Sequence, residues 1–336
     1  IRRPPRSTPK PSSAASDVYK RQPIQRSINK MSEREIKWKY PESIVSCEWL
    51  RKNLSDKNIR IYDCTTYLHY TDTHPSKPYD VESGIKNYRK GHIPNSAFMD
   101  IQEKLSNNDS DFKFTIPDYE ILANNFQDLG IGDPYHIILY SGNGIQWATR
   151  VWWLIFILGF SKVSILDGGI KEWKRLGFEL EKGENTYKKA RFVPRIDKTV
   201  FVDKEQTYTS LNKKGCILLN ALTSDLHRGE NSRYGRPGRI PGSKNIPFEE
   251  LVEDSQKLIS PQKAQAIFKN KNINQKIRVL NYCGGGIAAT LNAFVLRQLG
   301  IEKIEIYDNS MSEWAMDHQL PCLLYTSDAA DEGLGV

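Results

Sequence analysis

The chain has 336 residues, 39% of them hydrophobic, which is enough to bury the cores of two globular domains. Its mean hydropathy is −0.56, and its longest apolar run, residues 151–160, is about half as long as a membrane-spanning helix, so no membrane association is expected. The net charge of +8 is spread along the chain in short pairs such as Lys188 and Lys189, without interleaved aromatic residues, which argues against a nucleic-acid partner.

The segments near the two ends of the chain resemble translations of the same oligonucleotide. The segment SSAASDVYKRQ near the start and the segment CLLYTSDAADE near the end both resemble translations of one transposon-based sequencing adaptor, read on opposite strands. We therefore expect residues 1–22 and 322–336 to be adaptor-derived artefacts. On this interpretation the natural chain begins near Met31, and its own C-terminus is missing after about Pro321. The basic start is then no evidence for a mitochondrial transit peptide.

The five cysteines stand singly, with neither the paired spacing of a zinc site nor the density of a disulfide framework. We therefore expect no metal ion, and free thiols in a reducing compartment. This favours a cytoplasmic location, and a mitochondrial one stays open because the true N-terminus is not known.

The first half of the chain, residues 41–180, alternates short apolar strands with helices. A strand over residues 59–66 leads into the segment GHIPNSAFMDI, and a second strand over residues 136–141 is followed by a glycine-containing turn. A long apolar helix then runs through Leu158, and the segment VSILDGGIKEW at residues 163–173 closes this half. The pattern is typical of a parallel sheet built from strand–helix units.

Residues 174–195 are rich in Lys, Glu and Gly and are the predicted connection to a second half, residues 195–321, that repeats the same plan. Its strands are predicted at residues 216–223 and 278–283, and a helix that ends at Leu299 follows the latter strand. The segments GRIPGSKNIPF and IEIYDNSMSEW correspond to GHIPNSAFMDI and VSILDGGIKEW of the first half.

Individual residues of the two halves pair at a nearly constant offset. The pairs are Ile93 and Ile240, Tyr140 and Tyr282, Ser141 and Cys283, Asp167 and Asp308, and Trp173 and Trp314. A duplicated unit explains this regularity better than chance does. We therefore expect an α/β fold of two tandem domains, each a parallel sheet with helices on both faces.

The segment NYCGGGIAATLNAFVLRQLG carries the clearest sign of chemistry. Cys283 follows a buried strand, where ligands bind in open α/β sheets, and three glycines then lead into a helix. Gly284, Gly285 and Gly286 permit a tight curl with positive φ that turns backbone N–H groups inward. Together with the helix N-terminus, this curl is expected to stabilise a thiolate and lower the pKa of Cys283. The competing interpretation is that Cys283 is only a small buried hydrophobic residue.

With these features the chain resembles the rhodanese family, in particular its two-domain thiosulfate/3-mercaptopyruvate sulfurtransferases. The matching segments are HIP at residues 92–94, RVWW at 150–153, LDGGIKEW at 166–173, RPGRIPGSKNIPF at 236–248 and the Cys283 loop. The resemblance runs from about Ile44 to Pro321, which is nearly all of the chain between the two adaptor-like segments.

The resemblance implies a sulfurtransferase with one active domain. Residues 41–180 are then the non-catalytic domain, because Ser141 stands where the thiol should be and a hydroxyl cannot form a persulfide. Residues 195–321 are the catalytic domain, with Cys283 as the nucleophile. The residues whose amides would hold the persulfide are Gly284, Gly285, Gly286, Ile287, Ala288 and Ala289. No cofactor is implied, and the partners are a small-molecule sulfur donor and a cyanide or thiol acceptor.

The same resemblance implies that arginines before the IPG motif bind the donor's anionic group, and the candidates are Arg228, Arg233 and Arg236. The three-glycine loop matches neither the basic loop of thiosulfate-preferring members nor the Gly-Ser-Gly loop of mercaptopyruvate-preferring ones. Both donors therefore stay open. Because the loop has no cation to attract a dianion, we predict a preference for 3-mercaptopyruvate over thiosulfate.

Two other functions compete with this prediction. A cysteine-dependent phosphatase shares the general fold, but it needs an arginine about six residues after the cysteine to bind phosphate, and position 289 is alanine. A non-catalytic binding or regulatory module would suit the first half, which lacks the cysteine. The second half retains it, which favours an enzyme.

Overall fold

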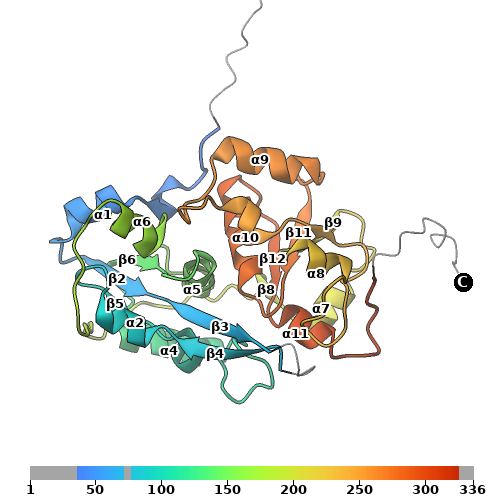
Figure 1. The fold of residues 1–336 in the computed structure, drawn as a ribbon, viewed down its shortest axis with the longest axis horizontal. Helices are drawn as coiled ribbons and strands as arrows, with labels where there is room; N and C mark the ends of the chain where they lie inside the picture. The colour runs from blue at the N-terminus through green and yellow to red at the C-terminus, as the bar shows by residue number, and fades with distance from the viewer. Residues whose placement is uncertain (1–35, 72–76, 325–336) are drawn as a thin grey trace, which may run out of the picture. The chain divides into compact units, whose positions relative to one another are not determined.

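The computed structural model describes residues 36–71 and 77–324, and two five-stranded parallel sheets form its framework (Figure 1). The first sheet has the order β1-β7-β6-β2-β5, which are Ile44–Val45, Val163–Leu166, His136–Tyr140, Ile59–Asp63 and Ala97–Phe98. The second has the order β8-β12-β11-β9-β10, which are Phe201–Val202, Ile304–Tyr307, Arg278–Tyr282, Cys216–Asn220 and Lys244–Asn245. The two orders correspond strand for strand, so the predicted duplication and the parallel sheets are confirmed.

Helices flank each sheet. Those of the first half are α1 (Cys47–Asn53), α2 (Ile85–Lys90), α3 (Ile101–Leu105), α4 (Tyr119–Leu129), α5 (Gln146–Ile157) and α6 (Gly169–Arg175), with the 3-10 helix η1 (Pro41–Ser43). Those of the second half are α7 (Lys204–Tyr208), α8 (Ser224–Arg228), α9 (Pro261–Asn270), α10 (Ala288–Gln298) and α11 (Ser310–Trp314), with the 3-10 helix η2 (Phe248–Leu251). The two long apolar helices end within one residue of their predicted ends.

Equivalent tyrosines, Tyr140 and Tyr282, end the central strands β6 and β11. Their hydroxyls accept hydrogen bonds from the backbone N–H groups of Ile93 and Ile240, each at 3.3 Å. Both tyrosines are fully buried. This contact ties the Ile-Pro segment of each half to the end of its central strand, which gives a physical reason for the recurrence of the segment.

Helices α5 and α10 are buried on nearly every side because they pack against each other. The Nε1–H group of Trp153 donates to the backbone carbonyl of Thr290 at 3.0 Å, and the hydroxyls of Thr149 and Thr290 lie 2.7 Å apart. Most of the apolar run at residues 151–160 therefore lies in a core helix, α5, that joins the two halves. In the part of the chain that the structure describes, no helix is long and apolar enough to cross a membrane.

A two-stranded antiparallel hairpin that the sequence did not predict leaves the first sheet. It consists of β3 (Thr66–Tyr70) and β4 (Tyr79–Ser83), and Figure 1 shows it running toward α11 of the second half. Among the described strands of the second half, none forms a matching hairpin. The hairpin is therefore a feature in which the two copies differ.

The predicted strands at residues 59–66 and 216–223 were too long at their carboxyl ends. Strand β2 ends at Asp63 because its carboxylate accepts hydrogen bonds from the backbone N–H and the hydroxyl of Thr65. Strand β9 ends at Asn220, whose side-chain oxygen accepts the N–H of Leu222 at 2.8 Å. In both halves a local side-chain contact turns the chain out of the sheet.

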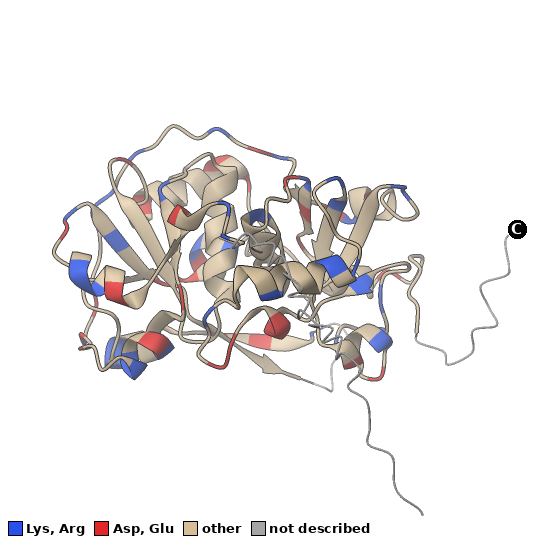
Figure 2. Ribbon diagram, turned by 90° about the horizontal axis from the view of Figure 1, so that it is seen from above, with Lys and Arg blue, Asp and Glu red and all other residues tan. Residues whose placement is uncertain are grey.

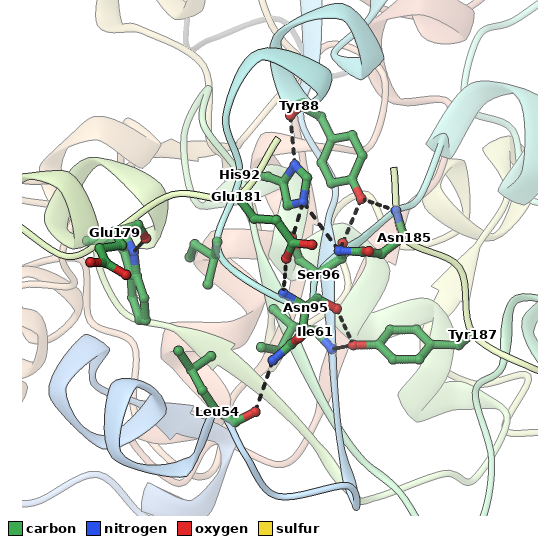
Figure 3. Close-up of polar contacts among 12 residues, drawn as sticks. Leu54, Ile61, Tyr88, His92, Asn95, Ser96, Glu179, Glu181, Asn185 and Tyr187 are labelled. Carbon is green, nitrogen blue, oxygen red and sulfur yellow. Dashed lines mark hydrogen bonds and ion pairs between the residues drawn. The ribbon is translucent and has the colours of Figure 1, made fainter. Parts of the chain in front are cut away.

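The connection predicted at residues 174–195 lies along the first half (Figure 3). His92 and Glu181 exchange backbone hydrogen bonds, both of 2.9 Å, and the N–H of Asn185 donates to the Tyr88 hydroxyl at 3.0 Å. The Nδ1 atom of His92 lies 2.9 Å from the carbonyl of Tyr88. The fully buried imidazole of the HIP segment is therefore used inside the first half.

Acidic and basic residues are interspersed along both halves (Figure 2). Several form exposed ion pairs, such as Lys39 with Glu302 at 2.8 Å and Lys162 with Asp133 at 3.2 Å. Pairs of this kind contribute at most about 1 kcal/mol each. The fold consequently depends on its apolar core.

The two adaptor-like segments lie mostly outside the residues that the structure describes. Residues 1–22 and 325–336 do not belong to the described residues. Residues 322–324 do, and Leu323 exchanges two backbone hydrogen bonds of 2.9 Å with Arg239. This short piece therefore contacts the second half, whatever its origin.

Candidate active site

Cys283 stands at the carboxyl end of β11, in the loop that leads into α10. Its side chain is buried, with 2% of its surface exposed. Its N–H donates to the hydroxyl of Ser310 at 3.0 Å, and its carbonyl accepts the N–H of Met311 at 3.1 Å. The carbonyl of Gly284 accepts the N–H of Ser312 at 2.7 Å. The start of α11 therefore fixes the backbone on which Cys283 sits.

The three glycines after Cys283 leave their N–H groups unused. Among the described residues, no group accepts a hydrogen bond from the N–H of Gly284, Gly285 or Gly286. The carbonyl of Gly286, by contrast, accepts a hydrogen bond of 3.1 Å from the guanidinium of Arg150, which also forms a buried ion pair of 2.7 Å with Asp308. A loop in which most carbonyls are bonded and the N–H groups are available can bind an anion.

The glycines are required for two different reasons. Gly286 has a φ of +71°, and a Cβ there would collide with the carbonyl of Asp308. Gly284 and Gly285 do not have positive φ, so the expected curl is confirmed only at Gly286. At the other two positions side-chain space is occupied: Tyr234 lies against Gly284, and a Cβ on Gly285 would be 2.5 Å from the Tyr79 hydroxyl.

Cys283 opens into a cavity of about 330 Å³ that both halves line. The second half contributes the loop, the start of α10, and residues of α8, η2 and the segments next to α8. These are Leu222, Thr223, Leu226, Arg233, Tyr234, Phe248, Glu249, Cys283, Gly284, Gly285, Ile287 and Ala288. The first half contributes residues of the hairpin and of the start of α5, which are Leu68, Tyr70, Tyr79, Gln146 and Trp147. The candidate site is therefore complete only with the first half in place.

Among the residues that the structure describes, Arg233 and Glu249 are the charged ones that line the cavity. The guanidinium carbon of Arg233 lies 3.8 Å from the ring centre of Tyr70, a cation–π contact between the two halves. Burial raises the pKa of the Glu249 carboxyl above its ordinary value. Burial likewise raises the pKa of the hydroxyls of Tyr70, Tyr79 and Tyr234, which keeps them protonated at neutral pH.

Only one of the three candidate arginines reaches the cavity. Arg233 lines it, whereas Arg228 forms a two-pronged ion pair with Glu230 at 2.6 and 2.8 Å and lies outside. Arg236 also lies outside. Its guanidinium donates to four backbone carbonyls, those of Trp314, Ala315, Asp317 and Leu320. Arg236 therefore holds the chain after α11 and has few donors left for a substrate.

The predicted loop residues divide in a similar way. Gly284, Gly285, Ile287 and Ala288 line the cavity with Cys283, whereas Gly286 and Ala289 do not. The sequence analysis missed Tyr70, Tyr79, Tyr234 and Glu249. No motif marks the two hairpin tyrosines, because the fold alone brings them to the other half. The position of Glu249 just after the segment GRIPGSKNIPF is the one signal that could have found it.

The equivalent loop of the first half uses its N–H groups internally. The N–H of Gly142 donates to the hydroxyl of Thr65 at 2.7 Å, and the N–H of Asn143 donates to the hydroxyl of Ser141 at 3.0 Å. The Asn143 side chain also donates to the carbonyl of Thr66 at 2.8 Å. This loop therefore lacks both a thiol and free donors at these positions.

The other cysteines lie in environments that disfavour a thiolate. Burial raises the pKa of Cys47 to about 12, and it raises the pKa of Cys64, Cys216 and Cys322 as well. The thiol of Cys47 points at the carbonyls of Asp167 and Gly169. None of these four residues lines the Cys283 cavity.

The chain is similar to known proteins in sequence and in fold. A family model described as the rhodanese-like domain matches residues 46–176 and 208–317, more than half of the chain. The chain is 27% identical over 309 residues to thiosulfate/3-mercaptopyruvate sulfurtransferase 2 of Arabidopsis thaliana, covering 83% of this chain and 86% of that protein. It is 28% identical over 285 residues to 3-mercaptopyruvate sulfurtransferase of Escherichia coli, covering 82% and 96%. The crystal structure of SseA from Escherichia coli, described as a 3-mercaptopyruvate sulfotransferase with the rhodanese fold, matches with a TM-score of 0.67 and 26% identity over 80% of this chain and 98% of that one.

Proposed function

Because the chain belongs to the rhodanese family, we propose that it is a sulfurtransferase that carries a sulfane sulfur on Cys283 as a persulfide. The observation that supports this most is the surroundings of Cys283, which lines a cavity next to three backbone N–H groups that no described residue uses. Such groups stabilise the negative charge of a thiolate and of the outer sulfur of a persulfide. The sulfurtransferase names of the relatives from Arabidopsis thaliana and Escherichia coli support the same reaction.

The reaction has two half-reactions. The Cys283 thiolate attacks the transferable sulfur of the donor, a bond between the two sulfurs forms, and the donor's old bond to that sulfur breaks with its electron pair leaving on the product. A nucleophilic acceptor, cyanide or a thiol, then attacks the outer sulfur and regenerates the thiolate. The free N–H groups of the loop serve both steps, since the sulfur next to them is anionic before and after each transfer.

The cavity favours 3-mercaptopyruvate as the donor. Its loop residues bring no cation, and the charge of Arg233 is accompanied by the carboxyl of Glu249. A dianion such as thiosulfate gains less from this environment than from a loop with its own cation. The single carboxylate of 3-mercaptopyruvate matches the single guanidinium of Arg233, which can bind it in a bidentate way.

The two halves have different roles in this proposal. Residues 195–321 form the catalytic domain and residues 41–180 the non-catalytic one, whose loop carries Ser141 in place of the cysteine. The non-catalytic domain still contributes to catalysis, because Tyr70 and Tyr79 line the cavity. A reducing compartment, the cytoplasm or the mitochondrial matrix, suits an enzyme that depends on a free thiol.

The proposal is tested by intact-mass analysis after incubation with each donor. The wild type should gain one sulfur, and Cys47→Ser and Cys216→Ser should gain it too, since these residues lie outside the cavity. Cys283→Ser should gain none, and it should transfer no sulfur to cyanide. A persulfide on Cys283→Ser would refute the assignment of the nucleophile.

A further inference from the structure

The hydroxyl of Tyr79 reaches the persulfide loop from the other half of the molecule. A Cβ on Gly285 would lie 2.5 Å from this hydroxyl, closer than real Cβ contacts, so the tyrosine occupies the place of a loop side chain. Tyr79 lines the same cavity as Cys283, and only one residue, Gly284, separates Cys283 from Gly285. A hydroxyl from the first half thus lies against the loop that carries the reacting sulfur, in the same cavity.

The ring of Tyr79 is held in this orientation by its neighbours. It lies between Tyr70, whose ring centre is 5.9 Å away at nearly a right angle, and Phe114, which is stacked at 6.3 Å. The carbonyl of Phe114 is in turn bonded by Arg150, the residue that holds the loop carbonyl of Gly286. Only 4% of the surface of Tyr79 is exposed. The hydroxyl is therefore positioned by a packed aromatic cluster and not by an exposed, variable side chain.

The hydroxyl is a proton donor at neutral pH. Burial raises the pKa of Tyr79, and the hydroxyl of Ser312 opposes this effect only in part. The carbon leaving group of 3-mercaptopyruvate needs such a donor. When its C–S bond breaks, the electron pair stays on the carbon as the enolate of pyruvate, which must be protonated. Thiosulfate differs, because sulfite leaves as a stable anion and needs no proton.

We propose that Tyr79 is a catalytic residue that protonates the enolate released from 3-mercaptopyruvate; this rests on the proposed function. The Cys283 thiolate forms the S–S bond as the donor's C–S bond breaks, and Tyr79 gives its proton to the leaving carbon, which yields pyruvate. The thiol proton of the donor remains on the outer sulfur of the persulfide. That S–H is more acidic than a tyrosine, so it returns the proton to Tyr79 and leaves a persulfide anion beside the loop N–H groups.

The test compares the two donors in single-turnover persulfide formation, measured by quenched-flow mass analysis. Tyr79→Phe keeps the ring and removes the hydroxyl. It should slow persulfide formation from 3-mercaptopyruvate at least about a hundredfold, the lower end of the range for general acid catalysis, and change the rate with thiosulfate less than threefold. An equal loss with both donors would mean a structural role, and no loss with 3-mercaptopyruvate would also overturn the proposal.

A second variant replaces the lost Tyr79 hydroxyl with a serine hydroxyl at position 285, on the loop itself. Without the Tyr79 hydroxyl, the nearest neighbours of a Cβ on Gly285 are atoms 3.7 and 3.8 Å away, an ordinary contact distance. The double variant Tyr79→Phe/Gly285→Ser should therefore fold and recover at least threefold of the rate with 3-mercaptopyruvate. A double variant no faster than Tyr79→Phe would contradict the role of the hydroxyl.

The matched control is Tyr62→Phe, which removes an equally buried hydroxyl that bonds the carbonyl of Leu129 outside the cavity. It should leave both donor rates unchanged, and a donor-specific loss in this control would overturn the proposal. If the wild type forms no persulfide from either donor, the result refutes the sulfurtransferase function itself and not only the role of Tyr79. The two failures are therefore distinguishable in one set of measurements.

Discussion

The carboxylates of Asp167 and Asp308, which occupy the same position in the two copies, each accept a backbone N–H from the opposite half. Asp167 bonds the N–H of Leu258 and Asp308 bonds that of Ile116, both at 2.8 Å. The exchange is reciprocal, but only Asp308 also pairs with Arg150. The second half thus has an additional connection, and it is the one that reaches the Cys283 loop.

The pH dependence of stability should reveal Asp167. Burial raises the pKa of this carboxyl to about 6, although the N–H of Leu258 and the charge of Lys257 act against it. A folded-state pKa above the ordinary 3.8 stabilises the fold below about pH 4, and this contribution disappears as the pH rises through about 6. The difference corresponds to roughly 3 kcal/mol. Asp167→Asn, which can still accept the Leu258 N–H, should therefore be more stable than the wild type at pH 7.5.

Urea unfolding of both proteins at pH 4.5 and pH 7.5 measures this effect. The advantage of Asp167→Asn should grow between the two pH values, and the exposed control Asp111→Asn should show no such growth. If the advantage of Asp167→Asn is the same at both pH values, the carboxyl is not held at a raised pKa.

Removing Arg150 should damage both the fold and the active loop. Arg150→Met leaves the half-buried carboxylate of Asp308 without its partner, which costs about 3–5 kcal/mol. It also frees the carbonyl of Gly286. The double variant Arg150→Met/Asp308→Asn should regain part of the stability, because no charge is stranded. It should not regain the rate of persulfide formation, since the loop stays unheld; urea unfolding and single-turnover kinetics report the two effects separately.

Substitution of Arg233 should affect donor binding, whereas substitution of Arg236 should affect stability. Arg233→Gln should raise the KM for 3-mercaptopyruvate on the order of tenfold with little change in the unfolding midpoint, because it loses a charged contact to the donor. Arg236→Gln should lower the free energy of unfolding by about 2–3 kcal/mol, since four carbonyls lose their donor, and leave the KM nearly unchanged. Steady-state kinetics and urea unfolding of both variants decide the matter, and the reverse pattern would contradict it.

A cysteine introduced at position 141 of the first half should not form a persulfide. In the background Cys283→Ser, the substitution Ser141→Cys restores a thiol at the equivalent position, but the neighbouring N–H of Gly142 is already bonded to Thr65. We expect no added sulfur after incubation with either donor. Intact mass checks this, and a persulfide on the introduced cysteine would mean that free N–H groups are not what separates the halves.

A chain of residues 23–321 should fold and keep the turnover of the full chain. It loses the two backbone hydrogen bonds between Leu323 and Arg239, worth about 1–3 kcal/mol together, so its melting temperature should fall by several degrees. Calorimetry and kinetics on both chains test this. Sequencing of the source transcript tests the adaptor interpretation independently, and continuous native coding sequence through residues 1–22 would defeat it.

Much of this architecture could be predicted because duplication and hydrophobic pattern are properties of the chain itself. Strands β6 and β11 are short and mostly apolar, and the glycines after Cys283 predict a loop at a strand end. Which arginine reaches the cavity could not be predicted, because Arg233 and Arg236 lie only three positions apart in the same irregular segment. Only the packed chain after α11 decides that Arg236 faces carbonyls.

The tyrosines of the cavity were beyond sequence reasoning for a related reason. Tyr70 and Tyr79 lie on a hairpin about 200 residues before Cys283, and no local pattern connects them with it. The role of Gly285 was misread as conformational freedom for the same reason. Its need for glycine comes from a hydroxyl of the other half, which the sequence does not display.

The crowding above Gly284 and Gly285 makes these positions dependent on two distant tyrosines. A mutation that adds a side chain at 285 is obstructed while Tyr79 is present, and a smaller residue at 79 removes the obstruction. A substitution at position 285 therefore depends on the residue at position 79. A change from one loop type to another requires substitutions at both positions. Homologues that bear serine at the position of Gly285 should consequently lack a tyrosine at that of Tyr79, and the two sites should covary although they belong to different domains.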